Sequence, residues 1–127
     1  MLPWTKRWNG SGSRATEVAT HQVFLTEGAR RDLEEIHNYL LRAESRARAD
    51  RLLDQLVEAS EALASFPERG AFPGELEALG IREYRQIVIG PYRVIYRVMG
   101  LRVFVYLIVD GRRDMRSLLE RRLLGKR

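Results

Sequence analysis

The chain has 127 residues, of which 45% are hydrophobic and 31% charged, and its formal net charge is +5. This length and composition fit one globular domain with a hydrophobic core and exclude a disordered chain. The absence of cysteine excludes disulfides, thiolate metal sites and catalytic thiols, and no apolar run approaches the roughly 20 residues that a membrane span needs. We therefore expect a soluble, cytoplasmic protein.

The charge is distributed unevenly along the sequence. Residues 1–80 hold 10 Lys/Arg and 13 Asp/Glu, a balance of −3, whereas residues 81–127 hold 12 and 4, a balance of +8. A surplus of one sign in part of a chain favours a partner of the opposite charge. The sequence thus predicts an acidic partner for the second part.

Residues 1–20 have the composition of a leader or linker. Trp4 and Trp8 precede the run Asn9–Ser13, which is rich in glycine and serine, and no hydrophobic periodicity begins before Val23. An engineered leader, a start placed upstream of the true one, and a basic arm with tryptophans for stacking all fit this pattern. We expect disorder over residues 1–20 and a folded domain over residues 21–127.

A short strand and two helices are predicted next. His21–Thr26 has the alternation of a β-strand, and Thr26 is suited to cap the helix that follows. Ser45 is the expected N-cap of a second helix, which ends before Phe66 because Pro67 disfavours helical geometry in the residue before it. The few residues between the helices require an antiparallel hairpin. The apolar stripe of the first helix consists of Ala29, Leu33, Ile36 and Leu40.

The C-terminal third is predicted to form three strands and a helix. Arg69–Gly80 contains glycine and proline and is expected to be a loop. Strands are predicted for Arg82–Ile89, Tyr92–Met99 and Leu101–Asp110, and a short helix follows them. The fold class is α+β: a short β-strand, an antiparallel helical hairpin, a three-stranded antiparallel β-meander and a short C-terminal helix, with helices on one face of the sheet.

Five of the arginines on or beside the predicted strands are candidates for a binding site. Strand alternation places Arg93 and Arg97 on the face opposite Val94 and Val98. Such guanidiniums repel one another unless an anion or local carboxylates neutralise them, so two interpretations stay open. One is a site for phosphate or an acidic peptide, and the other is a solvated face with Asp/Glu partners. The candidate anion-binding or target-binding set is Arg85, Arg93, Arg97, Arg112 and Arg113.

Several short motifs resemble the RelE/ParE toxins of bacterial type II toxin–antitoxin systems. Each motif alone is weak, but their order and spacing over Val23–Leu124 are jointly specific. The resemblance implies a toxin that is held silent by an antitoxin encoded beside it. The motifs are Gly90-Pro91-Tyr92-Arg93-Val94-Ile95-Tyr96-Arg97-Val98, Asp110-Gly111-Arg112-Arg113-Asp114, the helix Ala29–Leu41 and Phe66-Pro67-Glu68-Arg69-Gly70.

The two branches of that family differ in their targets. RelE-like members are ribosome-dependent endoribonucleases that cut mRNA, whereas ParE-like members poison DNA gyrase and have no nuclease chemistry. By resemblance, Arg85, Arg93 and Arg113 match basic positions of the nucleases, but arginine stays protonated and is a poor general base. The nucleases commonly carry a Tyr or His after the Gly-Arg-Arg-Asp motif, and Met115–Glu120 contains neither. His37 is interpreted as a residue of the helix face.

These observations favour a non-enzymatic gyrase poison. A ribosome-dependent mRNA endoribonuclease and a basic nucleic-acid-binding module are the alternatives. The resemblance also implies that the antitoxin lays a helical or extended, usually acidic, segment in the groove between the hairpin and the basic sheet. Core packing is the alternative role of Leu118, Leu119 and Leu123. No metal or cofactor is expected. The candidate antitoxin contacts are Leu33, Ile36, Leu40, Leu118, Leu119 and Leu123.

Overall fold

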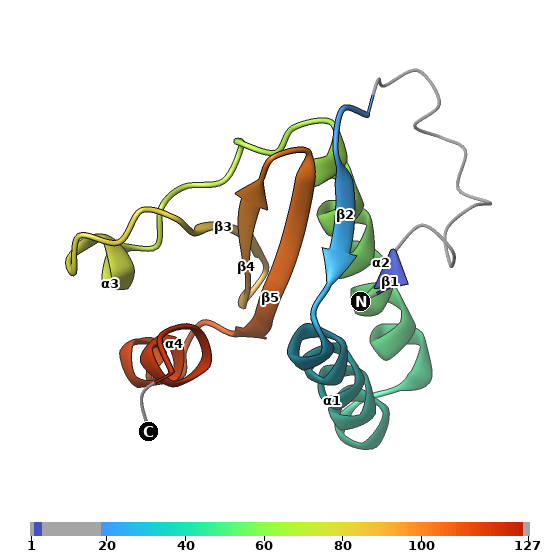
Figure 1. The fold of residues 1–127 in the computed structure, drawn as a ribbon. Coiled ribbons are helices and arrows are strands. Elements are labelled where there is room, and N and C mark those ends of the chain that lie inside the picture. Colours follow the sequence, from blue (N-terminus) through green and yellow to red (C-terminus); the bar gives the residue numbers. More distant parts are fainter. Residues whose placement is uncertain (1, 4–18, 126–127) are drawn as a thin grey trace.

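A single sheet with the strand order β1-β2-β5-β4-β3 forms the centre of the computed structural model, which describes residues 2–3 and 19–125 (Figure 1). Among the described helices, none is long and apolar enough to cross a lipid bilayer. The strands are β1 Leu2–Pro3, β2 Gln22–Leu25, β3 Arg85–Ile89, β4 Tyr92–Met99 and β5 Arg102–Asp110. The helices are α1 Glu27–Ala43, α2 Arg46–Glu61, the 3-10 helix η3 Ala62–Ala64, α3 Gly74–Glu77 and α4 Met115–Leu123.

The helical hairpin α1–α2 has the predicted caps. The Thr26 side chain accepts a hydrogen bond from the Ala29 N–H at 3.2 Å, and the Ser45 side chain accepts one from the Arg48 N–H at 3.1 Å. Each bond satisfies a backbone donor that has no partner within the first helical turn. The hairpin and its boundaries are therefore confirmed. The predicted stripe of α1 faces the core: Ala29, Leu33 and Leu40 are buried, and Ile36 packs against the same cluster.

The predicted meander is present, and an additional strand pairing extends it. β3, β4 and β5 pair antiparallel in sequence order, whereas β2 lies parallel to β5, with Val23 opposite Val103. A parallel partner needs a long connection, and the chain between β2 and β5 supplies one through the hairpin, α3, β3 and β4. Within the expected leader, residues 1–20, Leu2 and Pro3 pair with β2 and the Thr20 N–H bonds to the Ala64 carbonyl. The rest of that expectation, residues 1 and 4–18, lies outside the described residues.

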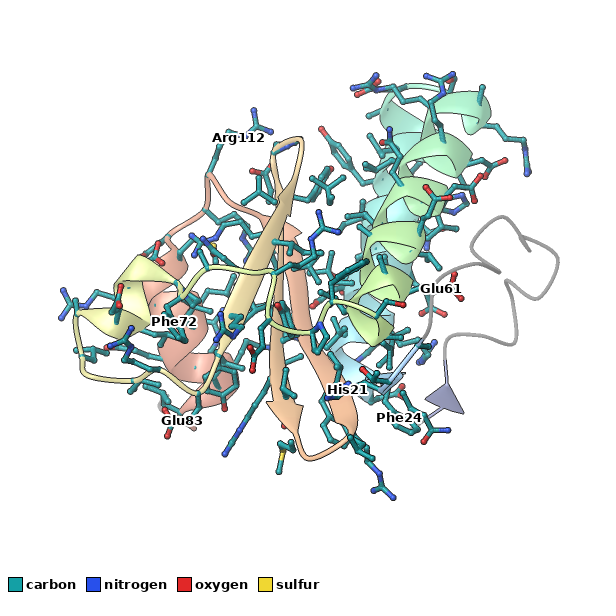
Figure 2. All side chains as sticks on the ribbon, turned by 90° about the horizontal axis from the view of Figure 1, so that it is seen from above. His21, Phe24, Glu61, Phe72, Glu83 and Arg112 are labelled. Carbon is teal, nitrogen blue, oxygen red and sulfur yellow. The ribbon has the colours of Figure 1, made fainter. Side chains whose placement is uncertain are left out.

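Helices cover both faces of the sheet, not one face as expected (Figure 2). The hairpin covers one face, and α3 and α4 lie on the other side. The difference arises because β5 is apolar on both faces and each face needs its own cover. The cluster under the hairpin includes Leu56, Val94, Tyr96, Val103 and Val105. The second cluster joins α4 to the sheet through Ile95, Leu107, Val109, Leu118 and Leu119.

Where β2 ends beside Val105, an ion pair between the buried Asp32 and the partly buried Arg122 completes the outer edge of β5. The Asp32 carboxylate of α1 accepts the Ile108 N–H at 3.0 Å and two bonds from the Arg122 guanidinium of α4 at 3.0 and 3.1 Å. Arg122 also donates to the Tyr106 carbonyl at 3.2 Å. The pair thus supplies backbone partners in place of a neighbouring strand and links the helices of the two layers.

The loop before β3 is more structured than expected. It contains the short helix α3, and β3 begins at Arg85, three residues later than predicted. The buried Tyr96 hydroxyl donates to the Pro67 carbonyl at 2.8 Å and accepts the Gly70 N–H at 3.0 Å. A Cβ at Gly70 would come within 2.6 Å of both the Gln86 carbonyl oxygen and the Tyr96 hydroxyl. This close approach gives the Phe66–Gly70 motif a structural role.

Replacing Arg122 with methionine should destabilise the protein, because it leaves the Asp32 carboxylate buried without its counter-charge. We expect the free energy of unfolding, measured by urea titration, to fall by about 3 kcal/mol. Arg121→Met is the matched control, since Arg121 is exposed and makes no hydrogen bond or ion pair with the described residues. Its effect should stay below about 0.5 kcal/mol. Equal losses in the two variants would contradict the role of the pair.

Tyr96→Phe should lower the free energy of unfolding by about 2 kcal/mol, because the Pro67 carbonyl and the Gly70 N–H lose their shared partner. Tyr39→Phe provides the comparison, as the Tyr39 ring is 58% exposed. Thermal unfolding of the two variants beside the wild type measures the difference. A Tyr96→Phe variant as stable as Tyr39→Phe would show that the hydroxyl does not hold the loop.

Candidate functional site

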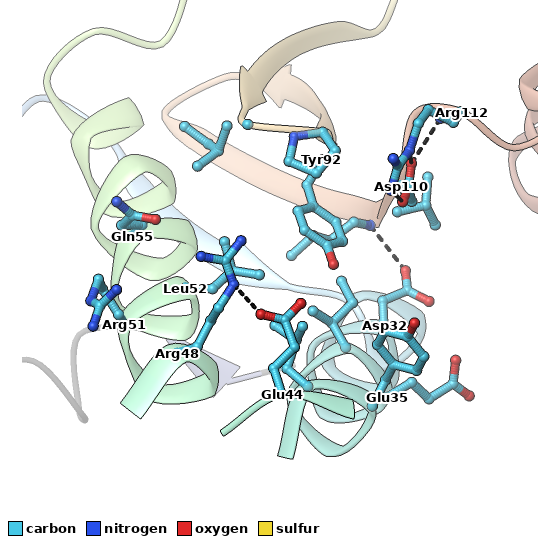
Figure 3. Close-up of a pocket in the computed structure, with 18 of the residues that line it drawn as sticks. Asp32, Glu35, Glu44, Arg48, Arg51, Leu52, Gln55, Tyr92, Asp110 and Arg112 are labelled. Atoms are coloured by element: carbon cyan, nitrogen blue, oxygen red, sulfur yellow. Dashed lines mark hydrogen bonds and ion pairs between the residues drawn. The ribbon is translucent and has the colours of Figure 1, made fainter. Parts of the chain in front are cut away.

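A groove of about 760 Å³ lies between the helical hairpin and the ends of the strands (Figure 3). One side is formed by α1 and the first half of α2. The other side is formed by the β3–β4 turn, the end of β5 and the residues that follow it. The lining residues that matter below are Asp32, Glu35, Ile36, Tyr39, Leu40, Glu44, Arg48, Arg51, Leu52, Tyr92, Ile108, Asp110, Arg112 and Arg113.

The floor of the groove is apolar and aromatic. Ile36 and Leu52 are half-buried and contact the core cluster beneath them. The Tyr92 side chain points from the start of β4 toward the helices, and burial together with the nearby Asp110 carboxylate raises the pKa of its hydroxyl. Tyr39 stands on α1 with 58% of its surface exposed. This combination offers contact area to an apolar side chain of a partner.

Two carboxylates of the groove are paired with neighbouring arginines of the same wall. Glu44 binds Arg48 at 2.5 Å, and Asp110 binds Arg112 through two contacts of 2.6 and 2.9 Å. The hydrogen bonds from Arg112 hold the pKa of Asp110 at about 2. Asp110 is therefore ionised at neutral pH, and its charge is offset inside the chain.

Arg93 has its own partners outside the groove. As predicted, Arg93 and Arg97 lie on the face opposite Val94 and Val98. The Arg93 guanidinium binds both oxygens of Glu75 at 2.8 and 2.9 Å and the Gln86 amide oxygen at 2.6 Å. The same contacts lower the pKa of Glu75. Of the two interpretations of these arginines, the one with local carboxylate partners is correct for Arg93.

Arg85 lies on the other face of the sheet. It is opposite Tyr96 in the strand register, donates to the Gly70 carbonyl at 2.8 Å and stacks over the Phe72 ring at 4.5 Å. Arg97 lies 5.8 Å from the centre of the Tyr84 ring. The five predicted arginines therefore do not form one cluster, because strand alternation and the loop separate them. Of these five arginines, Arg112 and Arg113 line the groove.

Two side chains that could transfer a proton, Tyr96 and His37, have partners of their own within the chain. The Tyr96 hydroxyl is engaged by the loop, and burial raises its pKa. His37 forms a hydrogen bond of 2.8 Å through its Nε2 with the Asp50 carboxylate of α2, which agrees with its interpretation as a helix-face residue. The part of the chain that the structure describes also holds no group of three or more His, Asp or Glu side chains placed to bind a metal ion.

The predicted antitoxin contacts divide between the core and the groove. Leu33, Leu118 and Leu119 are buried inside the chain, and Leu123 packs against the cluster of α4. Ile36 and Leu40 line the groove. Sequence reasoning missed Tyr39, Arg51 and Tyr92 as groove residues. The sequence pattern of α1 does place Tyr39 on the exposed side of the helix. It does not show that the strand ends lie opposite that side.

Comparison with known proteins relates this architecture to one family. The model for the ParE toxin of type II toxin–antitoxin systems matches residues 23–115. A solved structure described as a chromosomal ParDE system from P. aeruginosa has a TM-score of 0.61 and 20% identity, covering 72% of this chain and 96% of that chain. The toxin–antitoxin complex RelBE2 from Mycobacterium tuberculosis has a TM-score of 0.53 and 24% identity, with coverages of 73% and 99%. These identities support the fold only.

The comparison with curated protein sequences returned no match. The family match, in contrast, extends over most of the chain, from the strand before α1 to the start of α4. Strands β3 to β5, most of β2, the hairpin and the groove fall within it, whereas β1 lies outside it. This protein belongs to the ParE toxin family of type II toxin–antitoxin systems.

Proposed function

We propose that this chain inhibits growth in the cytoplasm by poisoning DNA gyrase and that a cognate antitoxin silences it by binding the groove. Membership of the ParE branch supports the gyrase target. The observation that favours binding over RNA cleavage is the placement of Arg85 and Arg93 on opposite faces of the sheet. Each of them is engaged by its own chain.

RNA cleavage needs a group that removes the 2′-OH proton, donors that stabilise the phosphate and an acid for the leaving oxygen. These groups have to converge on one atom. Arg85 and Arg93 do not converge, Arg113 lies at the groove, and the Tyr96 hydroxyl is occupied by the loop. Binding to a target enzyme requires only a complementary surface. This arrangement therefore supports a toxin that acts by binding its target and not by cleaving RNA.

The groove supports the second part of the proposal. The two structural neighbours are described as toxin–antitoxin systems. In this chain, the groove joins an apolar floor to two partly exposed tyrosines, Tyr39 and Tyr92. Tyrosine and arginine are the residue types that contribute most to protein interfaces, and a concave floor suits a helical or extended segment.

Purified chain added to gyrase, ATP and relaxed plasmid should accumulate cleaved gyrase–DNA complexes and reduce supercoiling in a concentration-dependent way. A parallel reaction with a type I topoisomerase should show no such complexes. Supercoiling that is unchanged at high toxin excess would exclude the gyrase target. Codon-positioned cuts in translated mRNA, mapped by primer extension, would then support the ribonuclease alternative.

Tyr39→Ala should weaken antitoxin binding by about tenfold or more, because an exposed aromatic anchor at the groove is removed. The antitoxin to test is a small acidic protein encoded beside the toxin gene. Val88→Ala is the matched control, since Val88 is 59% exposed and lies outside the groove. Calorimetry gives the affinities, and co-expression gives the protection of growth. Equal affinities of the two variants would place the antitoxin elsewhere.

A further inference from the structure

One part of the sheet surface lies outside both core clusters. Val23 and Val103, which are partners in the register of β2 and β5, are buried under the hairpin. Strand alternation therefore turns their neighbours Phe24 and Phe104 to the opposite face. On that face α3 and α4 pack over the end of β5, around Leu107, and neither phenylalanine belongs to that cluster. Figure 2 shows Phe24 at the β2 edge of the sheet, away from α3 and α4.

Phe24 and Phe104 form an aromatic pair on this part of the sheet. The two residues are register partners, their ring centroids are 5.6 Å apart, and their ring planes differ by 22°. Both rings are partly exposed. Tyr106 and Tyr84, whose rings meet edge to face at 5.6 Å, continue the aromatic surface toward the cluster of α4. The sheet thus presents aromatic area that no described helix covers.

Two guanidiniums border the phenylalanine pair. Arg97 is the register partner of Phe104 on β4, and Arg102 precedes Phe104 by two residues on β5, so both share its face. Arg97 lies 5.8 Å from the centre of the Tyr84 ring, and neither arginine makes a hydrogen bond or an ion pair with a described residue. Guanidiniums bind phosphate and carboxylate oxygens strongly, so this surface is suited to an anionic ligand.

We propose that this surface, defined by Phe24, Phe104, Arg97 and Arg102 and called the open face below, binds single-stranded nucleic acid. Unstacked bases lie on the rings, and the phosphates beside them contact the guanidiniums. Aromatic side chains on neighbouring strands, with arginines beside them, suit this ligand because every base has a π-face and every nucleotide carries a charge. The inference goes beyond the proposed function and does not depend on gyrase as the target.

Other occupants fit the open face less well. An acidic peptide would satisfy the guanidiniums but would leave the rings without flat groups to stack on. A duplex offers phosphates, but its bases stay stacked inside the helix. A second copy of the chain, docked on the same surface around a twofold axis, would bring cations of the two copies together. A single strand supplies both the flat groups and the negative charge.

Fluorescence anisotropy with labelled single strands tests the proposal on the full chain. Strands of about 12 nucleotides, one of deoxythymidine and one of uridine, represent the two sources of the ligand, and the tighter of the two identifies DNA or RNA. Binding should weaken as salt rises, because each phosphate contact contributes about −0.7 to the slope of log affinity against log salt.

Phe104→Leu should weaken single-strand binding by about tenfold, because it keeps an apolar side chain but removes the stacking surface. Phe66→Leu is the matched control, since Phe66 is 52% exposed in the loop after η3. It should leave the affinity almost unchanged. Neither substitution should alter binding to a duplex, since duplex binding uses no stacking on the rings. Thermal unfolding checks that both variants are folded.

The double variant Arg97→Ala and Arg102→Ala tests the phosphate contacts. It should reduce the salt slope by about 1.4, because two contacts of a single strand are lost. Arg46→Ala combined with Arg121→Ala removes the same charge at exposed positions of α2 and α4. This control should keep the slope of the wild type. Equal slopes of the two double variants would contradict the assigned contacts.

Photo-cross-linking locates the strand on the wild-type chain without any substitution. Strands that contain 5-iodouridine, which reacts with aromatic side chains against which it stacks, should label peptides that contain Phe24 or Phe104. Mass spectrometry identifies these peptides. Cross-links confined to the groove would assign the nucleic acid to another surface and overturn the proposal.

Three further results would overturn the proposal. These are no binding of either single strand, equal losses for Phe104→Leu and Phe66→Leu, and a dimer in analytical ultracentrifugation that Phe104→Leu dissociates. The gyrase reaction, repeated with Phe104→Leu, keeps this test separate from the proposed function. A chain that poisons gyrase but binds no single strand would retain the proposed function and lose this inference.

Discussion

The Asp32–Arg122 pair is the interaction on which the arrangement of the two layers depends. β2 is too short to cover the full edge of β5, so the Ile108 N–H and the Tyr106 carbonyl need other partners. A carboxylate from α1 and a guanidinium from α4 provide them and neutralise each other. Gly28 allows this, because a Cβ there would approach the Arg122 guanidinium to 2.7 Å. One buried pair thus replaces strand pairing and fixes α4 relative to the hairpin.

Pairing inside the chain also engages two arginines of the sheet. Arg93 holds α3 through Glu75, and Arg85 holds the Phe66–Gly70 loop through backbone carbonyls. A buried or half-buried charge is costly unless it is paired, so arginines inside the layers become structural. The positions left to a partner are those at the rim, where water screens the unpaired charge. Arg112 and Arg113 lie at this rim, beside the groove that we propose as the recognition surface.

Local patterns in the sequence predict much of the fold. Side-chain caps at Thr26 and Ser45 and the stripe of α1 define the hairpin, and the alternation in Tyr92–Met99 defines β4. The parallel pairing of β2 with β5, the paired β1 and the second covered face were not predictable in this way. They depend on contacts between residues that are far apart in the sequence, as in the separation of 90 residues between Asp32 and Arg122.

The sequence by itself determined most of the elements, the family resemblance and the excess of arginine, because periodicity, caps and motif spacing are properties of neighbouring residues. Only the tertiary structure decided which arginines are free. Arg85, Arg93, Arg112 and Arg113 look equivalent in the sequence, yet Arg85 binds carbonyls, Arg93 and Arg112 bind carboxylates, and Arg113 faces the groove. The physical reason is that the effective charge of a side chain depends on the partner that the fold brings to it.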